Sequence, residues 1–191
     1  MEEYKLKNGK TLKVYNDDSA ESPRSWDNLA KMVFFGGKER LGDKHNVELT
    51  GSYANRWDFA EQGAEDVKKI MDAVICLPVH YYEHGSAGIS LSATDYPFNC
   101  PWDSGTIGFA VVTKSALRKE YSLKRVTKKA IETAMTVVRG EVETLNQYIA
   151  GEVYGFRVFN EEGEEEDSCW GFYGSDVKTN GMLEHVGELA E

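Results

Sequence analysis

The most regular pattern in this 191-residue chain is a run of apolar residues spaced three or four positions apart between Lys124 and Ala150. This spacing places apolar side chains on one face of a helix, and Gly151 directly afterwards is a typical helix end. The members of the stripe are Val126, Ala130, Ala134, Val137, Val138, Val142, Leu145 and Ile149. We therefore expect one long helix over about 124–150.

Hairpins are predicted on both sides of this helix. Near the start of the chain, Asn8-Gly9 supplies the two positive φ values of a tight turn between segments in which apolar residues alternate with lysines. After the helix, a second hairpin is predicted at about 152–173, with an acidic turn. Apolar and β-branched segments predict further strands at 32–35, 75–82, 88–91 and 105–113.

Two shorter helices complete the expected elements, one at about 58–74 and the other within 180–190. Pro78 has no backbone N–H, so we expect its strand to lie at a sheet edge or to contain a bulge. Strands on both sides of the helices, without regular βαβ alternation, predict an α+β fold with a mainly antiparallel sheet. Because the chain has no internal repeat and no Pro/Ser-rich linker, we expect residues 1–191 to form a single domain.

Composition excludes several classes of protein. The chain is 41% hydrophobic and 12% aromatic, which is not typical of a disordered protein. No apolar run approaches the roughly 20 residues of a membrane span, and the first residues do not resemble a signal peptide. Three widely spaced cysteines, Cys76, Cys100 and Cys169, favour a reducing cytoplasm over a disulfide scaffold. We expect a cytoplasmic protein with no membrane partner.

Negative charge is concentrated towards the C-terminus. The formal net charge is −10, yet residues 1–139 carry 19 acidic and 20 basic residues, whereas residues 140–191 carry 13 and two. A solvated loop is one explanation of the densest run. The other is a surface that imitates nucleic-acid phosphates and binds a basic partner. The candidate contact residues are Glu161, Glu162, Glu164, Glu165, Glu166 and Asp167.

Soft metal ligands are present but scattered along the chain. The usual zinc signature, a C-x-x-C pair, is missing, and the sequence requires no cofactor. A zinc site assembled from distant loops would use His45, His84, Cys100 and Cys169. The alternative interpretation is that these residues are buried cysteines and ordinary polar histidines.

Catalytic motifs are weak. Cys100 is a candidate nucleophile because a thiolate needs a neighbouring base and His84 lies one strand earlier, although turn and packing residues explain the same loop. Glu141 and Glu143 are two apart on the long helix, so they point to different faces and do not form an acid/base pair. There is no P-loop, dinucleotide-binding or nucleophile-elbow motif. We therefore do not expect an enzyme.

Aromatic and basic residues raise the question of nucleic-acid binding. Tryptophans could stack bases if Lys and Arg interleaved with them, but their positions in strands and beside Pro and Gly favour core packing. The four are Trp26, Trp57, Trp102 and Trp170. A basic segment at 114–129 carries seven Lys and Arg. It could touch DNA or RNA, or it could pair with the acidic hairpin of its own chain or of a second copy in a homodimer.

Several blocks of the sequence resemble a family of phage and prophage proteins. The first blocks are Glu-Ser-Pro-Arg-Ser-Trp-Asp-Asn-Leu at 21–29 and Leu-Gly-Asp-Lys-His at 41–45. The later blocks lie at 82–86, 100–108, 140–143, 151–155 and 167–172. They keep their order and span nearly the whole chain. The family pattern has Leu-Gly-Thr-Met where this chain has Leu-Ala-Lys-Met at 29–32.

The resemblance implies a role in phage-infected or lysogenic bacteria. Some members of the family resemble anti-CRISPR proteins that inhibit the type II effector nuclease. Such a protein would bind the effector or its guide complex and block loading or cleavage of target DNA. The effector holds nucleic acid in a positively charged channel, which the acidic hairpin matches in sign. The alternatives are a nucleic-acid-binding phage accessory protein, a metal-dependent or cysteine enzyme, and a structural phage protein.

Overall fold

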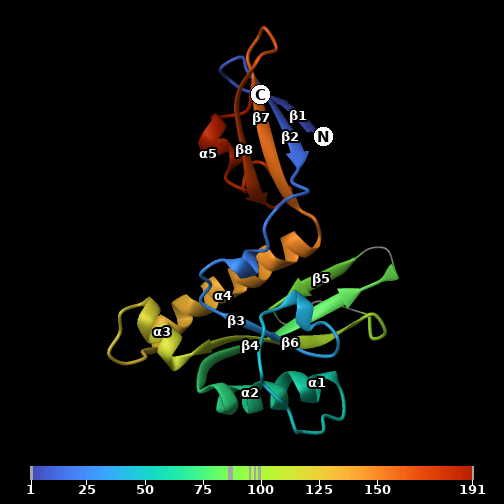
Figure 1. Ribbon diagram of the computed structural model, residues 1–191, viewed down its shortest axis with the longest axis vertical. Coiled ribbons are helices and arrows are strands. Elements are labelled where there is room, and N and C mark those ends of the chain that lie inside the picture. Colours follow the sequence, from blue (N-terminus) through green and yellow to red (C-terminus); the bar gives the residue numbers. More distant parts are fainter. Residues whose placement is uncertain (1, 86–87, 95, 97, 99, 191) are drawn as a thin grey trace. The chain divides into compact units, whose positions relative to one another are not determined.

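The computed structural model describes residues 2–85, 88–94, 96, 98 and 100–190 (Figure 1). Where a single domain is predicted, the contacts divide the chain into two compact units. Unit 1 comprises Met1–Pro23 and Gln147–Glu191, and unit 2 comprises Arg24–Asn146. The reason is that each unit has its own four-stranded antiparallel sheet and its own buried apolar cluster. The predicted α+β class, with antiparallel strands and one long helix, is confirmed.

Unit 1 is a sheet with strand order β1-β2-β7-β8. Its strands are β1 (Glu2–Lys5), β2 (Thr11–Asn16), β7 (Val153–Phe159) and β8 (Glu165–Tyr173). Leu12 and Val14 of β2 are buried and alternate with Lys13 and Tyr15, which therefore lie on the opposite face. Helix α5 (Met182–Val186) packs on the buried face through Met182. The core is completed by Leu6, Phe156, Val158, Phe172 and Val177.

The first predicted hairpin is confirmed, but its turn differs from the prediction. Only Gly9 has a positive φ, of 85°, whereas Asn8 does not. Gly9 N donates to Leu6 O and Leu6 N donates to Lys10 O, so the loop is one residue longer than a two-residue turn. A longer turn with one left-handed glycine replaces the predicted tight turn.

Unit 2 is a sheet with strand order β3-β6-β4-β5. Its strands are β3 (Lys31–Phe34), β4 (Ala73–Glu83), β5 (Ile89–Ser92) and β6 (Ser104–Thr113). Figure 1 shows helices on both faces of this sheet, with α2 (Ala64–Met71) on one and α4 (Lys128–Ile149) on the other. Covering on both faces explains why Ile107–Val112 is an unbroken apolar, buried run apart from Gly108. Short 3-10 turns, η1 (Pro23–Ser25) and η2 (Glu39–Leu41), flank β3.

The long helix α4 begins four residues later than predicted, because Thr127 precedes it and accepts a hydrogen bond from Ala130 N through its hydroxyl. Gly151, with φ of 72°, follows the end of the helix as predicted. The separate helix α3 (Lys114–Glu120) was not predicted. Its local signal is Thr113, whose hydroxyl accepts a hydrogen bond from Ala116 N as an N-cap.

The helix predicted at 58–74 is divided and ends early. It consists of α1 (Arg56–Asp58), a π-helical turn η3 (Phe59–Gly63) and α2. Asp72 adopts a left-handed φ of 48° and ends it, so Val74 belongs to β4. The prediction for Pro78 is confirmed in part. Among the described residues Pro78 pairs only with β6, because pairing of β4 with β5 begins at His80. A register shift between Val79 and His80 lies directly after Pro78.

The predicted core packing of the tryptophans is wrong. All four are between 43% and 91% exposed, and Trp102 is the most exposed. Smaller apolar side chains from the strands and from α4 fill the cores instead. Among the described residues, no helix is both long enough and apolar enough to cross a membrane.

Candidate interaction site on the acidic hairpin

The acidic run forms the turn and the first residues of the β7–β8 hairpin. The turn is fixed by hydrogen bonds from Asn160 N to Glu164 O at 3.0 Å and from Gly163 N to Asn160 O at 3.1 Å. Gly163 has φ of 85°, and the Asn160 side chain accepts a further bond from Glu164 N. The local bonds hold the backbone of the turn while Glu161, Glu162 and Glu164 remain exposed to solvent. The negative charge is therefore carried on a defined turn.

The six predicted contact residues fall into two groups. Glu165 forms an ion pair with Arg157 at 3.2 Å, and Glu166 forms one with Lys10 at 2.6 Å. The structure describes no ion pair for the other four, which are Glu161, Glu162, Glu164 and Asp167. The pairing of β7 with β8 shifts register at the same place, since Val158 pairs with Asp167 and Phe159 pairs with Glu165. The uncompensated charge is therefore concentrated at the end of the hairpin.

The outer face of the same sheet carries the exposed Trp170 and the half-buried Tyr15. The Trp170 indole lies across Gly155 of the neighbouring strand: a Cβ atom built on Gly155 would lie 2.1 Å from the indole ring. Tyr15 lies beside Trp170, with ring centroids 6.3 Å apart, and the Arg157 guanidinium is 5.6 Å from the Tyr15 ring. The glycine thus lets an exposed indole lie flat on the strand in a fixed place.

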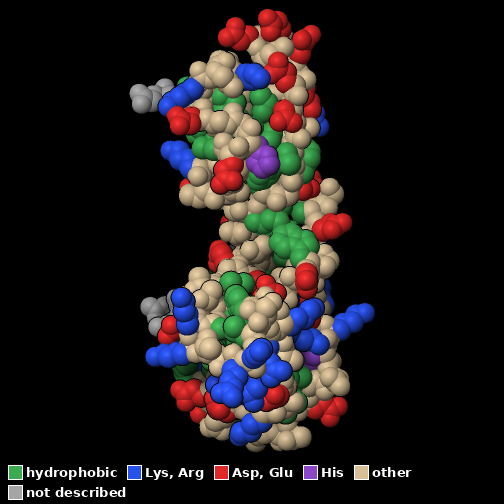
Figure 2. Space-filling model, turned by 90° about the vertical axis from the view of Figure 1, so that its left-hand side faces the viewer, with side chains coloured by type: hydrophobic (Ala, Val, Ile, Leu, Met, Phe, Trp, Pro, Cys, Tyr) green, Lys and Arg blue, Asp and Glu red, His purple; other side chains and the backbone are tan. Residues whose placement is uncertain are grey.

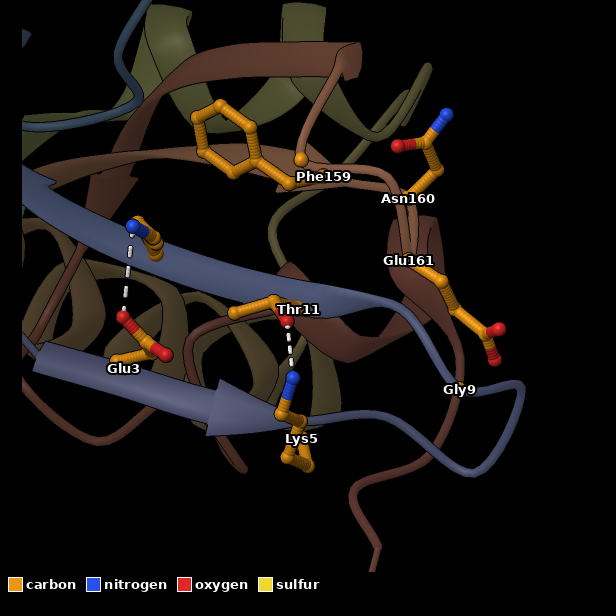
Figure 3. A pocket seen from close by; sticks show the side chains of 9 residues that line it. Glu3, Lys5, Gly9, Thr11, Phe159, Asn160 and Glu161 are labelled. Carbon is orange, nitrogen blue, oxygen red and sulfur yellow. Dashed lines mark hydrogen bonds and ion pairs between the residues drawn. The ribbon is translucent and has the colours of Figure 1, made fainter.

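A pocket of about 500 Å³ lies at the base of the turn. Figure 3 shows Phe159 on one side of it and Glu161 pointing towards the loop that contains Gly9. The two ammonium groups are already engaged, Lys5 with the Thr11 hydroxyl at 2.6 Å and Lys13 with Glu3 at 3.5 Å. The lining thus contains two lysines and two glutamates, and one of the glutamates, Glu161, belongs to the acidic turn.

The charge of the whole chain resides in unit 1. This unit contains 16 acidic and 6 basic residues, a net of −10, whereas unit 2 contains 16 of each. Figure 2 shows acidic side chains gathered around the end of the hairpin. Counting by folded unit therefore assigns the whole excess of negative charge to unit 1.

The predicted metal ligands are not brought together as a set. His45 is engaged through both ring nitrogens, with Phe34 O at 2.8 Å and Val47 N at 3.3 Å. Cys169 belongs to unit 1, whereas the other three belong to unit 2. In the described part of the chain, no three His, Cys, Asp or Glu side chains are placed to hold a metal ion.

His84 and Cys100 do meet, but at a carboxylate. Asp103 Oδ2 is 2.7 Å from His84 Nδ1 and accepts a hydrogen bond from Cys100 Sγ at 3.3 Å. These bonds, first that of His84 and then that of Cys100, lower the pKa of Asp103. The thiol therefore contacts a carboxylate rather than an imidazole base. The arrangement fits hydrogen bonds that hold the loop in place better than it fits a catalytic nucleophile.

A partly buried ionic network in unit 2 was missed by sequence reasoning. Glu141 accepts hydrogen bonds from Leu29 N at 2.7 Å and Ala30 N at 3.0 Å. Arg24 is bonded to both carboxylate oxygens of Asp43, at 3.2 and 2.6 Å, and lies 3.8 Å from Glu141. Burial raises the pKa of Glu141, although the two N–H groups and then Arg24 oppose this. Glu141 thus anchors the segment before β3 to α4.

The sequence blocks that carry the family resemblance meet in pairs or threes. Arg24, Asp43 and Glu141 come from three blocks and form the partly buried network. His84 and Asp103 come from two others, and the His84 side chain is exposed. The blocks at 151–155 and 167–172 meet where the exposed Trp170 covers Gly155. The first set is explained by stability, and the other two lie at the surface.

No protein-family model, curated protein or solved structure matches this chain. The functional interpretation therefore depends on the residues and their geometry.

Proposed function

We propose that this chain is an anti-CRISPR protein whose unit 1 binds a basic, nucleic-acid-holding surface of a type II CRISPR effector nuclease. Binding there would block loading or cleavage of target DNA by occupying the surface, with no chemical step. The proposal combines the family resemblance with the sign of the charge, because such effectors hold nucleic acid in a positively charged channel.

The observation that carries the proposal is the uncompensated charge at the turn of the β7–β8 hairpin. Glu161 and Glu162 are exposed, and neither forms an ion pair with a described residue. Glu165 and Glu166 are instead neutralised by neighbouring cations. Carboxylates without local partners keep their charge available to a basic surface, and opposite potentials accelerate association. We accordingly place the main electrostatic contact at Glu161, Glu162 and Glu164, and give Glu165 and Glu166 a minor part.

The aromatic pair Trp170 and Tyr15 on the outer face of the same sheet supports binding to a protein surface. Trp170 is 43% exposed and is held by Gly155 and Tyr15, so little side-chain freedom would be lost when a partner covers it. Exposed, preorganised tryptophan and tyrosine are the residue types that dominate binding energies at protein interfaces. The acidic turn would steer the encounter, and this face would hold the complex.

The test is inhibition of target-DNA cleavage by purified effector–guide complex. We expect Glu161→Lys/Glu162→Lys to raise the inhibitor concentration needed for half inhibition by about tenfold or more, since two attractive charges become repulsive. The matched control is Asp18→Lys/Glu21→Lys, which makes the same change of charge at exposed positions in the loop after β2, beside the first residues of β7 and at the opposite end of that strand from the turn.

Three results would count against the proposal. The first is no inhibition by the wild-type protein of any type II effector tested. The second is an equal loss in both double variants, which would show that only net charge matters. The third is full inhibition by the Glu161→Lys/Glu162→Lys variant. Circular dichroism of both variants checks that the fold survives.

A further inference from the structure

Unit 2 carries a surface of the opposite sign, on α3, the following segment and the first turn of α4. Residues 114–129 contain seven Lys and Arg and one acidic residue, Glu120. All seven cationic side chains are exposed. Figure 2 faces the side on which α3 lies in Figure 1 and shows Lys and Arg side chains gathered in the lower part of the view. This basic surface is distinct from the acidic hairpin, which belongs to unit 1.

Most of these cations have no local counter-charge. Lys114 forms an ion pair with Asp72 at 2.5 Å, and Lys128 lies 3.9 Å from Glu132. The other five cations form no ion pair with a described residue; they are Arg118, Lys119, Lys124, Arg125 and Lys129. Like charges held close together favour an anionic partner, and a polyanion can contact several of them at once.

A mainly apolar pocket of about 310 Å³ adjoins the cations. Its lining includes Tyr121 and Leu123 from the segment after α3, and Ala130 and Thr133 from α4, while Lys129 belongs to both the pocket and the basic surface. The bond from Leu123 N to Arg118 O, at 2.9 Å, ties the segment back to α3. An aromatic, apolar hollow next to cations matches an unstacked base beside its phosphates.

We propose that this surface binds single-stranded nucleic acid, with phosphates on the five cations and one base in the pocket beside Tyr121. A duplex keeps its bases stacked and would offer phosphates alone. The acidic hairpin of a second copy is the competing occupant, but its turn, Asn160–Glu164, contains only Asn, Glu and Gly and has no apolar side chain to fill the pocket. The proposal does not depend on the function proposed for unit 1.

The experiment is fluorescence anisotropy of the full chain with a labelled 20-nucleotide oligothymidylate, the matching single-stranded RNA and a 20-base-pair duplex, at 50–200 mM NaCl. For five phosphate contacts we expect a slope of log affinity against log salt of about −3.5, or about a hundredfold weaker binding across this range. Single strands should bind more tightly than the duplex at every salt concentration.

Two sets of variants separate the charge from the pocket. Lys124→Gln/Lys129→Gln should make the salt slope shallower by about 1.4, because each lost contact removes about 0.7. The matched control, Lys31→Gln/Lys44→Gln, removes two exposed lysines elsewhere in unit 2 and should leave the slope unchanged. Tyr121→Ala should weaken single-strand binding about tenfold with little effect on the duplex, while Tyr121→Phe keeps the stacking ring and the affinity.

The proposal is overturned if no oligonucleotide binds at 50 mM NaCl, or if the two lysine pairs reduce the slope equally. Preference for the duplex, or loss of affinity in Tyr121→Phe as large as in Tyr121→Ala, removes the base-binding pocket. Sedimentation of the protein without nucleic acid measures whether it self-associates. Self-association at 50 mM NaCl that Glu161→Lys/Glu162→Lys abolishes would assign the basic surface to a second copy instead.

Discussion

The two units contrast in where they place their charged residues. In unit 2 acidic and basic residues are equal in number, and three of them are partly buried: Arg24, Asp43 and Glu141 form a network that anchors α4 to the chain before β3. In unit 1 the net charge is −10, and its ion pairs lie between exposed strands and loops. Charge in the first case stabilises the fold, and in the second it is available to a partner.

The largest expected effect tests whether the units are energetically separate. Phe109 in unit 2 and Phe156 in unit 1 are both fully buried, each in its own cluster. Replacement of either by alanine should cost about 3–5 kcal/mol. Hydrogen exchange should show faster exchange in the unit that carries the substitution and little change in the other. Equal acceleration in both units would mean that they unfold together.

The partly buried network of unit 2 should give the next largest effect. Glu141→Ala leaves two backbone N–H groups and Arg24 without this carboxylate, and we expect unfolding to become easier by about 2–4 kcal/mol. The measurement is denaturant unfolding of the variant and the wild type at pH 7. Arg139→Ala, also on α4 but exposed, is the control and should change stability little.

Glu141 also predicts a pH dependence of definite sign. Its pKa in the folded chain is raised above the ordinary value of 4.5, mainly by burial. The protonated form is therefore favoured by folding, so its contribution is complete below about pH 4.5 and is lost as the pH rises through the raised pKa. The stability of the wild type minus that of Glu141→Gln should fall between pH 4 and pH 7. A difference that rises with pH would contradict the direction of the shift.

Two glycine substitutions should change stability in opposite directions. Gly155→Ala introduces a Cβ where the Trp170 indole lies, and should cost about 1–3 kcal/mol or displace the ring. Gly140→Ala lies on the exposed side of α4 with nothing within 4 Å, and should stabilise the protein by about 0.5–1 kcal/mol. Thermal unfolding measures both, and inhibition assays of Gly155→Ala show whether the position of Trp170 matters for binding.

The smallest expected effect is on the rates at which a thiol reagent modifies the three cysteines. Burial raises the pKa of the Cys76 thiol to about 12, whereas Cys100 and Cys169 are partly exposed. At pH 8 a disulfide reagent should modify Cys100 and Cys169 first, and Cys76 only when unit 2 opens. Phe109→Ala should accelerate labelling of Cys76 and Phe156→Ala should not, which distinguishes opening of the two units without spectroscopy.

Local patterns in the sequence identified most elements of the fold. Apolar periodicity located α4, and β-branched runs located β3, β6 and the two hairpins, because side-chain spacing within one segment is a local property. The errors in the predicted helix boundaries occurred where a single residue began or ended a helix. Asp72 ended the first helix before Val74, Thr127 delayed the start of α4, and Thr113 began the unpredicted helix α3.

The site was accessible to sequence reasoning only in part. The acidic hairpin follows from six acidic residues between two strand patterns, and charge needs no contact to be recognised. Its division into paired and unpaired carboxylates depends on Lys10, which immediately precedes β2, and on Arg157 of β7. No composition or spacing argument could have supplied this, because strand register is set by the packing of the whole sheet.

The sequence by itself determined the fold class, the positions of the main elements and the accumulation of negative charge towards the C-terminus, since each depends on residues that are neighbours in the chain. Only the tertiary structure decided which residues meet. It separated the chain into a neutral and an acidic unit, laid Trp170 across Gly155 and placed Glu141 against Leu29 and Ala30. These contacts join segments far apart in the sequence, and their partners are selected by packing and register rather than by local preference.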